Sequence, residues 1–90
     1  MSATLFVHHA CADYDAWRAG YDALAEFQSE HGVLAQSVHR SPDDPNVVTV
    51  LHRFASLEEA RAFVELDELK EDMERIGVVR PVRIEILEDV

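Results

Sequence analysis

Two hydrophobic periods alternate along the chain, and their order limits the fold more than any other feature. In four segments the apolar residues recur at every second position, which is the pattern of a β-strand with one buried face. In two longer segments they recur at steps of three and four, which is the pattern of an amphipathic helix. The predicted strands span residues 4–10, 33–40, 47–54 and 78–87, and the predicted helices lie between Asp13 and Gly32 and between Ser56 and Gly77.

Both predicted helices carry start signals. Asp13 can cap the first helix, which we expect to run without interruption for about five turns. Ser56 and Glu59 form the capping-box pattern at the start of the second helix. The pair Leu66-Asp67 is a point where that second helix can bend or break.

The order strand, helix, strand, strand, helix, strand matches the split β-α-β arrangement, so we predict an α+β, ferredoxin-like fold. Four antiparallel strands would then lie in the spatial order 4-1-3-2, with both helices on one face of the sheet. A chain of 90 residues fits one domain, residues 1–90. The sheet face without helices still carries apolar residues, and two such faces packed together would form a homodimer.

Charge limits the partners that the chain can have. Eighteen Asp and Glu against eight Lys and Arg give a net charge of −10, which repels phosphate backbones and anionic lipid. We therefore expect neither nucleic acid nor a membrane surface as a partner. One cysteine cannot form an internal disulfide, and residues 1–4 contain neither the charges nor the apolar run of a signal peptide, so we expect a cytoplasmic location.

Four short motifs occur together in this order. They are HACADYDAW at residues 9–17, DDPN at 43–46, FASLEEA at 54–60 and IGV at 76–78. With them the chain resembles the dimeric α/β-barrel superfamily, which includes antibiotic-biosynthesis monooxygenase-like proteins, over residues 9–88. The resemblance implies a homodimer with a pocket in each subunit between sheet and helices. Members of the superfamily include cofactor-independent oxygenases, polyketide cyclases and haem-degrading enzymes, so the resemblance says more about fold than about reaction.

Several cofactors are not expected. Haem-degrading relatives present a histidine from the helix after the third strand, where this chain reads LKEDM at residues 69–73. Three glycines cannot make a dinucleotide-binding loop. If the turn between the second and third strands centres between Asp43 and Asp44, His39 lies opposite Val48 and roughly 13 Å from His52, too far to share a metal. We therefore predict no metal and no cofactor.

Aromatic and apolar side chains at helical and strand spacing predict the pocket walls. The predicted wall residues are Trp17, Tyr21, Val50, Phe54, Phe63 and Met73. Trp17, Tyr21 and Phe63 are also what an amphipathic helix needs to fill a core. Relatives commonly place tryptophan where this chain has Phe54, which keeps an aromatic ring but loses an N–H donor.

Two histidines are candidates for the polar group of the pocket. His8 and His9 are neighbours in a strand and leave opposite faces, so at most one of them lines a pocket. His9 matches a histidine that relatives often show before the Asp-Tyr pair, and we predict it as the catalytic base, with a pKa lowered by burial. The alternative is a strand-end histidine satisfied by a backbone carbonyl. His52 is a second pocket candidate, with a surface position as its alternative.

These features predict a protein that binds a hydrophobic, aromatic or polyketide-like molecule. Such a protein can be a cofactor-independent monooxygenase or cyclase, because an electron-rich substrate supplies its own reactivity and the protein supplies a base and a shaped cavity. It can equally be a binding or scavenging module without turnover, or a purely structural dimerisation unit. Whether a ligand-sized cavity holds a titratable group without a charge partner separates the first two of these alternatives, the enzyme and the binding module.

Overall fold

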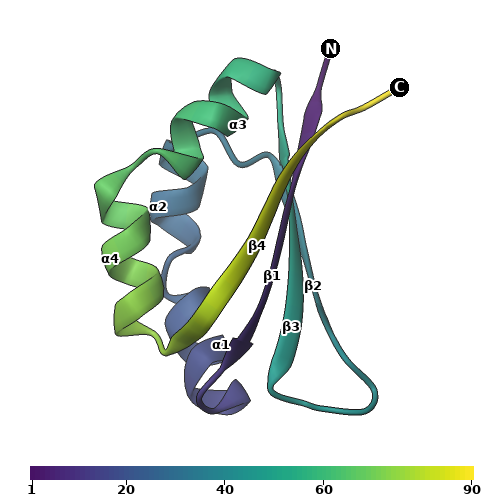
Figure 1. Cartoon of the computed structure of the whole chain (residues 1–90). Helices are drawn as coiled ribbons and strands as arrows, with labels where there is room; N and C mark the ends of the chain where they lie inside the picture. The colour runs from purple at the N-terminus through teal and green to yellow at the C-terminus, as the bar shows by residue number, and fades with distance from the viewer.

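A computed structural model describes residues 1–90 as one sheet covered by helices (Figure 1). The elements are β1 (Ala3–Cys11), α1 (Tyr14–Asp22), α2 (Ala25–Glu30), β2 (Ala35–Arg40), β3 (Val47–Phe54), α3 (Leu57–Val64), α4 (Asp67–Arg75) and β4 (Val78–Glu88). The predicted strands therefore form where the period-2 pattern places them, to within two residues at each end. No helix is long and apolar enough to cross a membrane.

The four strands form one antiparallel sheet in the order β2-β3-β1-β4. In β1, Leu5 pairs with His52 of β3 on one side and with Ile86 of β4 on the other. This is the predicted order 4-1-3-2, and the α+β ferredoxin-like fold is confirmed. Both termini lie at the same end of the sheet (Figure 1), where the Asp89 N–H donates to the Ser2 carbonyl at 3.1 Å.

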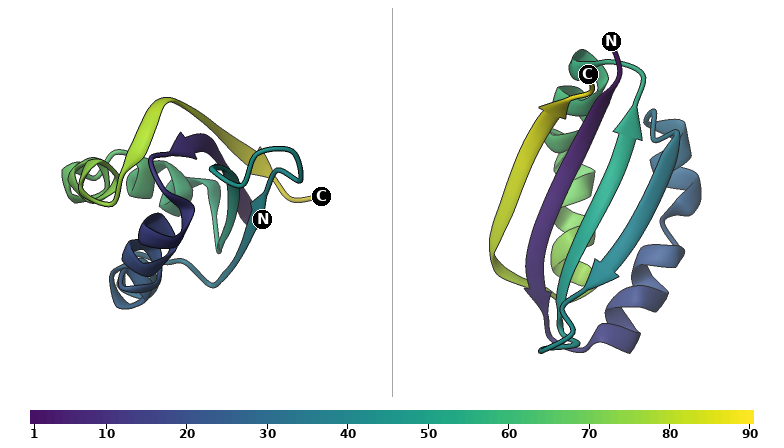
Figure 2. Two further views of the ribbon diagram at one scale, coloured as in Figure 1. Left: turned by 90° about the horizontal axis from the view of Figure 1, so that it is seen from below. Right: turned by 90° about the vertical axis from the view of Figure 1, so that its right-hand side faces the viewer.

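All four helices cover the same face of the sheet, as the two views of Figure 2 show. The core between the layers contains two groups of buried side chains. The first group is Ala3, Leu5, Phe54, Ala60 and Phe63. The second group is Cys11, Trp17, Tyr21, Val48 and Val50. Alternation along β1 and β3 supplies the sheet side of both groups, because every second residue of a strand points to the helices.

The first helical region is two helices, so the prediction of one continuous helix is wrong. α1 ends at Asp22 and α2 begins at Ala25. At the junction the Leu24 N–H donates to the Tyr21 carbonyl at 3.0 Å, which is the tighter three-residue spacing of a 3₁₀ turn. No glycine or proline stands between Asp22 and Ala25, so the local sequence does not mark this break.

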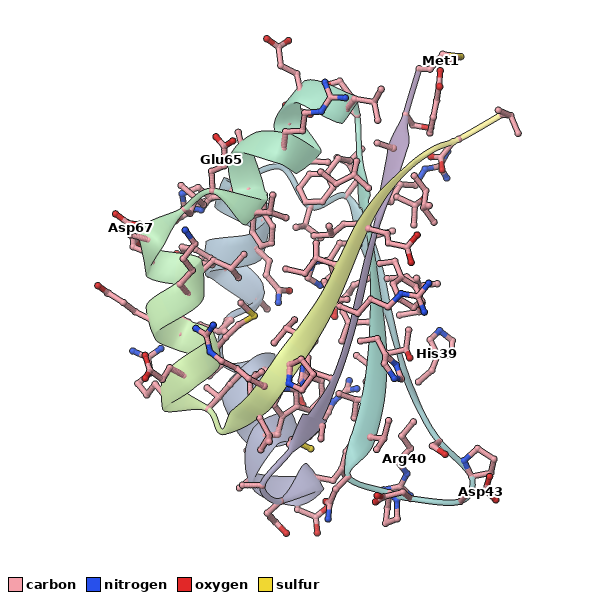
Figure 3. All side chains as sticks on the ribbon, in the orientation of Figure 1. Met1, His39, Arg40, Asp43, Glu65 and Asp67 are labelled. Carbon is pink, nitrogen blue, oxygen red and sulfur yellow. The ribbon has the colours of Figure 1, made fainter.

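The second helical region breaks where the sequence predicts. The Ser56 hydroxyl accepts the Glu59 N–H at 3.2 Å and starts α3, and α4 begins after Leu66. Glu65 and Asp67 flank the break on the side away from the sheet (Figure 3). Gly77 ends the region with φ of 91°, in the left-handed region that favours glycine.

The hairpin between β2 and β3 differs from the predicted register by one residue. His39 pairs with Thr49 rather than Val48. The turn centres on Asp44, whose backbone carbonyl accepts the Val47 N–H at 3.1 Å and whose carboxylate accepts the Asn46 N–H at 3.0 Å. His39 points away from the helices (Figure 3), on the opposite face of the sheet from His52.

A β-bulge lies in β4 opposite His9. His8 pairs with Arg83, whereas Ala10 pairs with Val79, so residues 80–82 of β4 stand opposite His9 alone. The extra residues locally separate β4 from β1 and re-aim side chains at that point. The bulge therefore opens the edge of the sheet next to one of the two candidate histidines.

The uncovered face of the sheet is only partly apolar. Phe6 and Leu51 are half-buried neighbours on it, and Leu87 is exposed beside them. Polar side chains share this face: His8 and Thr49 form a hydrogen bond at 2.8 Å, and ion pairs also lie there. The face thus combines an apolar centre with a polar surround.

Candidate functional site

A cavity lies between the sheet and the helices and takes lining residues from both core groups. Sixteen residues line it, of which thirteen are hydrophobic and only His9, Gln28 and His52 are not. They come from β1, β3, β4 and all the helical segments. Figure 3 shows side chains from both layers in the space between the sheet and the helices. The cavity volume is about 50 Å³. It is therefore a small, almost wholly apolar space with three polar side chains in its wall.

Seven of the eight residues that the sequence predicts for the pocket line this cavity. They are His9, Trp17, Tyr21, Val50, His52, Phe63 and Met73. Phe54 does not line it. The Phe54 side chain is fully buried, with its ring 5.3 Å from the Phe63 ring, and it packs with Ala60 at the far end of the core. The end of β3 lies beneath α3, so an aromatic residue there closes the core instead of the cavity.

Gln28 is a wall residue that the sequence analysis missed. It is only 4% exposed, and its Oε1 atom has no hydrogen-bond partner. Gln28 stands four residues after Leu24 and seven after Tyr21, on the apolar face of the helical pattern. The sequence did carry a signal for Gln28, namely a polar residue at a helical position that the pattern expects to be buried and apolar. Because a buried amide normally has a hydrogen-bond partner, such a residue is a candidate for a site.

Tyr21 connects His52 to β2 through a short hydrogen-bond chain. The Tyr21 hydroxyl donates to Oε1 of Gln36, and the Tyr21 oxygen lies 2.7 Å from Nε2 of His52. A hydroxyl has one proton, so once it is donated to Gln36 the oxygen can only accept from His52. His52 therefore carries its proton on Nε2, and its Nδ1 holds a lone pair.

The Nδ1 atom of His52 is buried and has no partner. His52 is 5% exposed, and burial alone lowers its pKa from 6.5 to about 4. Burial also raises the pKa of Tyr21 to about 12, so its hydroxyl stays protonated. The ring of His52 is thus neutral at pH 7 and presents an unused acceptor in an apolar wall.

His9 is held differently. Its Nδ1 lies 2.8 Å from the Ala10 carbonyl, which can only accept, so Nδ1 carries the proton and Nε2 holds the lone pair. Burial lowers the pKa of His9, the hydrogen bond to Ala10 opposes that shift, and the neighbouring charge of His8 adds to it. The Trp17 ring meets the His9 ring edge-on, with 5.7 Å between centroids.

A row of rings joins the two histidines across the cavity wall. Centroid distances are 5.7 Å from His9 to Trp17, 5.0 Å from Trp17 to Tyr21, and 6.0 Å from Tyr21 to His52. His9 pairs with Val48, four residues from His52 on β3, so the two histidines lie roughly 13 Å apart along the sheet. The two histidines therefore line opposite ends of the cavity. No group of three or more His, Cys, Asp or Glu side chains is placed to bind a metal ion.

A groove beside the cavity adds most of the available space. It has a volume of about 500 Å³ and lies between α4 and β4. The groove and the cavity share three lining residues, Met73, Val78 and Ile84. A ligand site in a protein usually measures about 300 Å³ or more, so the cavity alone takes only a small group and the groove must take the rest of a ligand.

The chain belongs to the antibiotic biosynthesis monooxygenase family, whose pattern matches residues 3–75. The match includes His9, the aromatic residues of α1, the β2-β3 hairpin and both helices that follow β3. A comparison with curated proteins gives no match.

Solved structures with the same fold include a proposed antibiotic biosynthesis monooxygenase from Bordetella bronchiseptica. It is 13% identical, with 99% of this chain and 97% of that chain covered and a TM-score of 0.83. SnoaB from Streptomyces nogalater, a cofactor-independent oxygenase, is 10% identical over 99% of this chain and 93% of its own, with a TM-score of 0.80. A conserved protein from Methanosarcina mazei is 13% identical over 100% and 94%, with a TM-score of 0.79. At these identities the likeness establishes the fold alone.

Proposed function

We propose that the protein binds a hydroxylated aromatic molecule in the cavity and groove and acts on it as a cofactor-independent monooxygenase or cyclase. The observation that carries this proposal is the Nδ1 atom of His52, a buried, neutral and unpartnered base in an apolar wall. A buried acceptor without a partner costs stability, about 1–3 kcal/mol, and such a cost is typical of functional sites. Family membership and the fold of SnoaB support the same class of reaction.

The two unpartnered acceptors define what the ligand offers. Oε1 of Gln28 and Nδ1 of His52 both lack a donor, and both residues line the cavity. A ligand hydroxyl can donate to either atom and relieve its unpaired state. A hydroxyl on an aromatic ring fits best, because the other thirteen wall residues are hydrophobic and the Tyr21 hydroxyl among them is already bonded to Gln36 and His52, which leaves few groups for a sugar or a peptide.

The chemistry follows from the base. Nδ1 of His52 accepts a hydrogen bond from the bound hydroxyl and takes its proton as the ring reacts, because a pKa of about 4 disfavours full proton transfer beforehand. The negative charge that develops on the ring makes it electron-rich enough to react with molecular oxygen or to attack an electrophilic carbon within the same molecule. In the oxygenation, one atom of O₂ enters the ring as a new carbonyl oxygen, and the other leaves as water with two hydrogens of the substrate. The substrate is the reductant. The apolar wall excludes water from the anion and orients the ring.

We also propose that the protein is a cytoplasmic homodimer. Phe6, Leu51 and Leu87 give the uncovered sheet face an apolar centre, and a chain of this size gains from burying it. The expected mass by light scattering is twice 10.2 kDa. A mass of one chain at micromolar concentration would contradict the dimer.

Oxygen uptake with a dihydroxynaphthalene tests the catalytic proposal. We expect uptake of one O₂ for each hydroxynaphthoquinone formed, without added metal, flavin or nicotinamide. Binding of the probe without oxygen uptake or ring closure would overturn the enzyme and favour a binding module. Absence of binding by both dihydroxynaphthalene and naphthol would overturn the site.

A further inference from the structure

We propose that the natural ligand is a carboxylic acid whose carboxylate lies between Lys70 and Arg80 at the groove, with its apolar body directed into the cavity. This inference rests on the proposed site and names the chemical class of its ligand. It is carried by charge and geometry at the groove between α4 and β4.

We take the groove as the mouth of the cavity because the two spaces adjoin. Met73, Val78 and Ile84 line both spaces, so a molecule in the groove contacts the same side chains that close the cavity. Ile84, which lines both spaces, is 39% exposed, which is unusual for a large apolar side chain next to a core. The mouth is therefore apolar on its inner side.

Two positive charges stand on the outer side of the mouth. Lys70 reaches the groove from α4 and Arg80 from β4. Arg80 belongs to the bulge that separates β4 from β1 opposite His9, so the bulge places this cation at the mouth. The side chains of Lys70 and Arg80 form neither an ion pair nor a hydrogen bond with another residue.

These two are unusual among the cations of the chain. Of the eight Lys and Arg residues, four form ion pairs with nearby carboxylates, and Arg40 lies over the Tyr14 ring at 4.5 Å. The four paired cations are Arg18, Arg53, Arg75 and Arg83. Only Arg61, Lys70 and Arg80 are left without an ion pair or an aromatic partner. Two of these three meet at one groove, in a protein whose net charge is −10.

The local charge favours a single negative charge on the ligand. Glu74 is the only carboxylate that lines the groove, so the lining carries two positive charges and one negative charge. Both a monoanion and a dianion are attracted by the two cations and repelled by the acidic protein, but the lining's net charge of one positive unit matches a monoanion and leaves a dianion with an uncompensated charge. A carboxylate on an apolar ring therefore fits better than a phosphate.

Matched ligands test the proposal directly. Calorimetry compares hydroxynaphthoate with the neutral hydroxynaphthamide and with naphthyl phosphate. We expect hydroxynaphthoate to bind about tenfold more tightly than the amide at low salt, since each exposed cation contributes about threefold. Raising salt from about 50 to about 500 mM should remove most of that preference and leave the amide unchanged. The phosphate should bind less tightly than the carboxylate.

Matched variants locate the effect. Lys70→Gln and Arg80→Gln together should abolish the preference for hydroxynaphthoate and leave binding of the amide intact. Arg61→Gln removes the third free cation, which does not line the groove, and should change neither. Glu74→Gln should strengthen carboxylate binding by about threefold.

The outcomes separate this inference from the proposed function. Equal binding of carboxylate and amide, or a preference that survives in the double variant, would overturn the acid ligand and leave the proposed site standing. Tighter binding of the phosphate would overturn the monoanion. Failure of all three probes to bind would overturn the site and this inference with it.

Discussion

The two histidines of the cavity wall lie on neighbouring strands and face the same layer of helices, yet their surroundings differ. The Nδ1–H group of His9 donates a hydrogen bond to the Ala10 carbonyl, and His9 lies beside the bulge and the groove. The Nε2–H group of His52 donates a hydrogen bond to the Tyr21 oxygen, and the Nδ1 atom of His52 is buried without a partner. The pKa of both is lowered by burial, but only His52 has no hydrogen bond to a carbonyl that opposes the shift. Alternation along a strand decides which residues face the cavity, whereas their chemistry depends on the hydrogen-bond partner of each ring, which is a carbonyl of its own strand for His9 and a helix tyrosine for His52.

The largest expected effect is on turnover. His52→Leu removes the proposed base and should lower the rate of oxygen uptake by about 1000-fold, the usual contribution of a general base. His9→Leu should lower it by less than about tenfold, through packing against Trp17. Rates are measured with the dihydroxynaphthalene, and circular dichroism verifies that both variants fold. The exposed His39→Leu is the control. If His9→Leu were the more damaging change, the roles of the two histidines would be reversed.

Stability should depend on pH through His52. In the unfolded chain His52 titrates near 6.5, and in the folded protein at about 4, so below 6.5 the unfolded state binds a proton that the folded state does not. The free energy of unfolding should therefore fall as pH drops from 6.5 towards 4, by about 3 kcal/mol from this group. Urea unfolding of the protein and of His52→Leu at several pH values measures the difference.

The difference between those two curves isolates His52 from the many carboxylates that titrate in the same range. His9→Leu should remove a smaller part of the same slope, because its hydrogen bond to Ala10 opposes the effect of burial. Parallel curves for the protein and His52→Leu would show that the buried ring does not exclude its proton.

A smaller effect is expected from Tyr21→Phe. The variant keeps the ring that stacks on Trp17 but leaves the Nε2 proton of His52 without an acceptor, at a cost of about 1–2 kcal/mol. It should also raise the share of His52 that carries its proton on Nδ1, and so reduce the basic form. Tyr14→Phe is the control, since Tyr14 has no contact with His52. Nitrogen chemical shifts of the imidazole report the proton position, and an unchanged share would show that Tyr21 does not set it.

The strands and the limits of the second helical region were predictable because each rests on a local pattern: alternation, a capping box, a terminal glycine. The strand order followed from the sequence of elements, and the break between α3 and α4 falls at the predicted pair Leu66-Asp67. The break between α1 and α2 was not predictable, because no glycine or proline stands between Asp22 and Ala25 to mark it. The wall of the cavity was largely predictable from apolar spacing. Phe54 was not, since its burial depends on α3 crossing the end of β3.

The different hydrogen bonding of His9 and His52 could not be predicted from the sequence. His9 is marked by a resemblance and His52 only by its place in a strand, because its unpaired Nδ1 results from a tyrosine thirty-one residues away in another element. The bulge opposite His9 is likewise a property of strand pairing, and Arg80 lies within it and lines the groove.

The most direct measurement is an NMR titration of all five histidines, with and without naphthol. The account predicts that His52 stays neutral down to about pH 4 with its proton on Nε2, that His9 carries its proton on Nδ1, and that naphthol shifts the Nδ1 resonance of His52 but not those of His31 and His39. A His52 that titrates near 6.5, or that carries its proton on Nδ1 in the free protein, would contradict it.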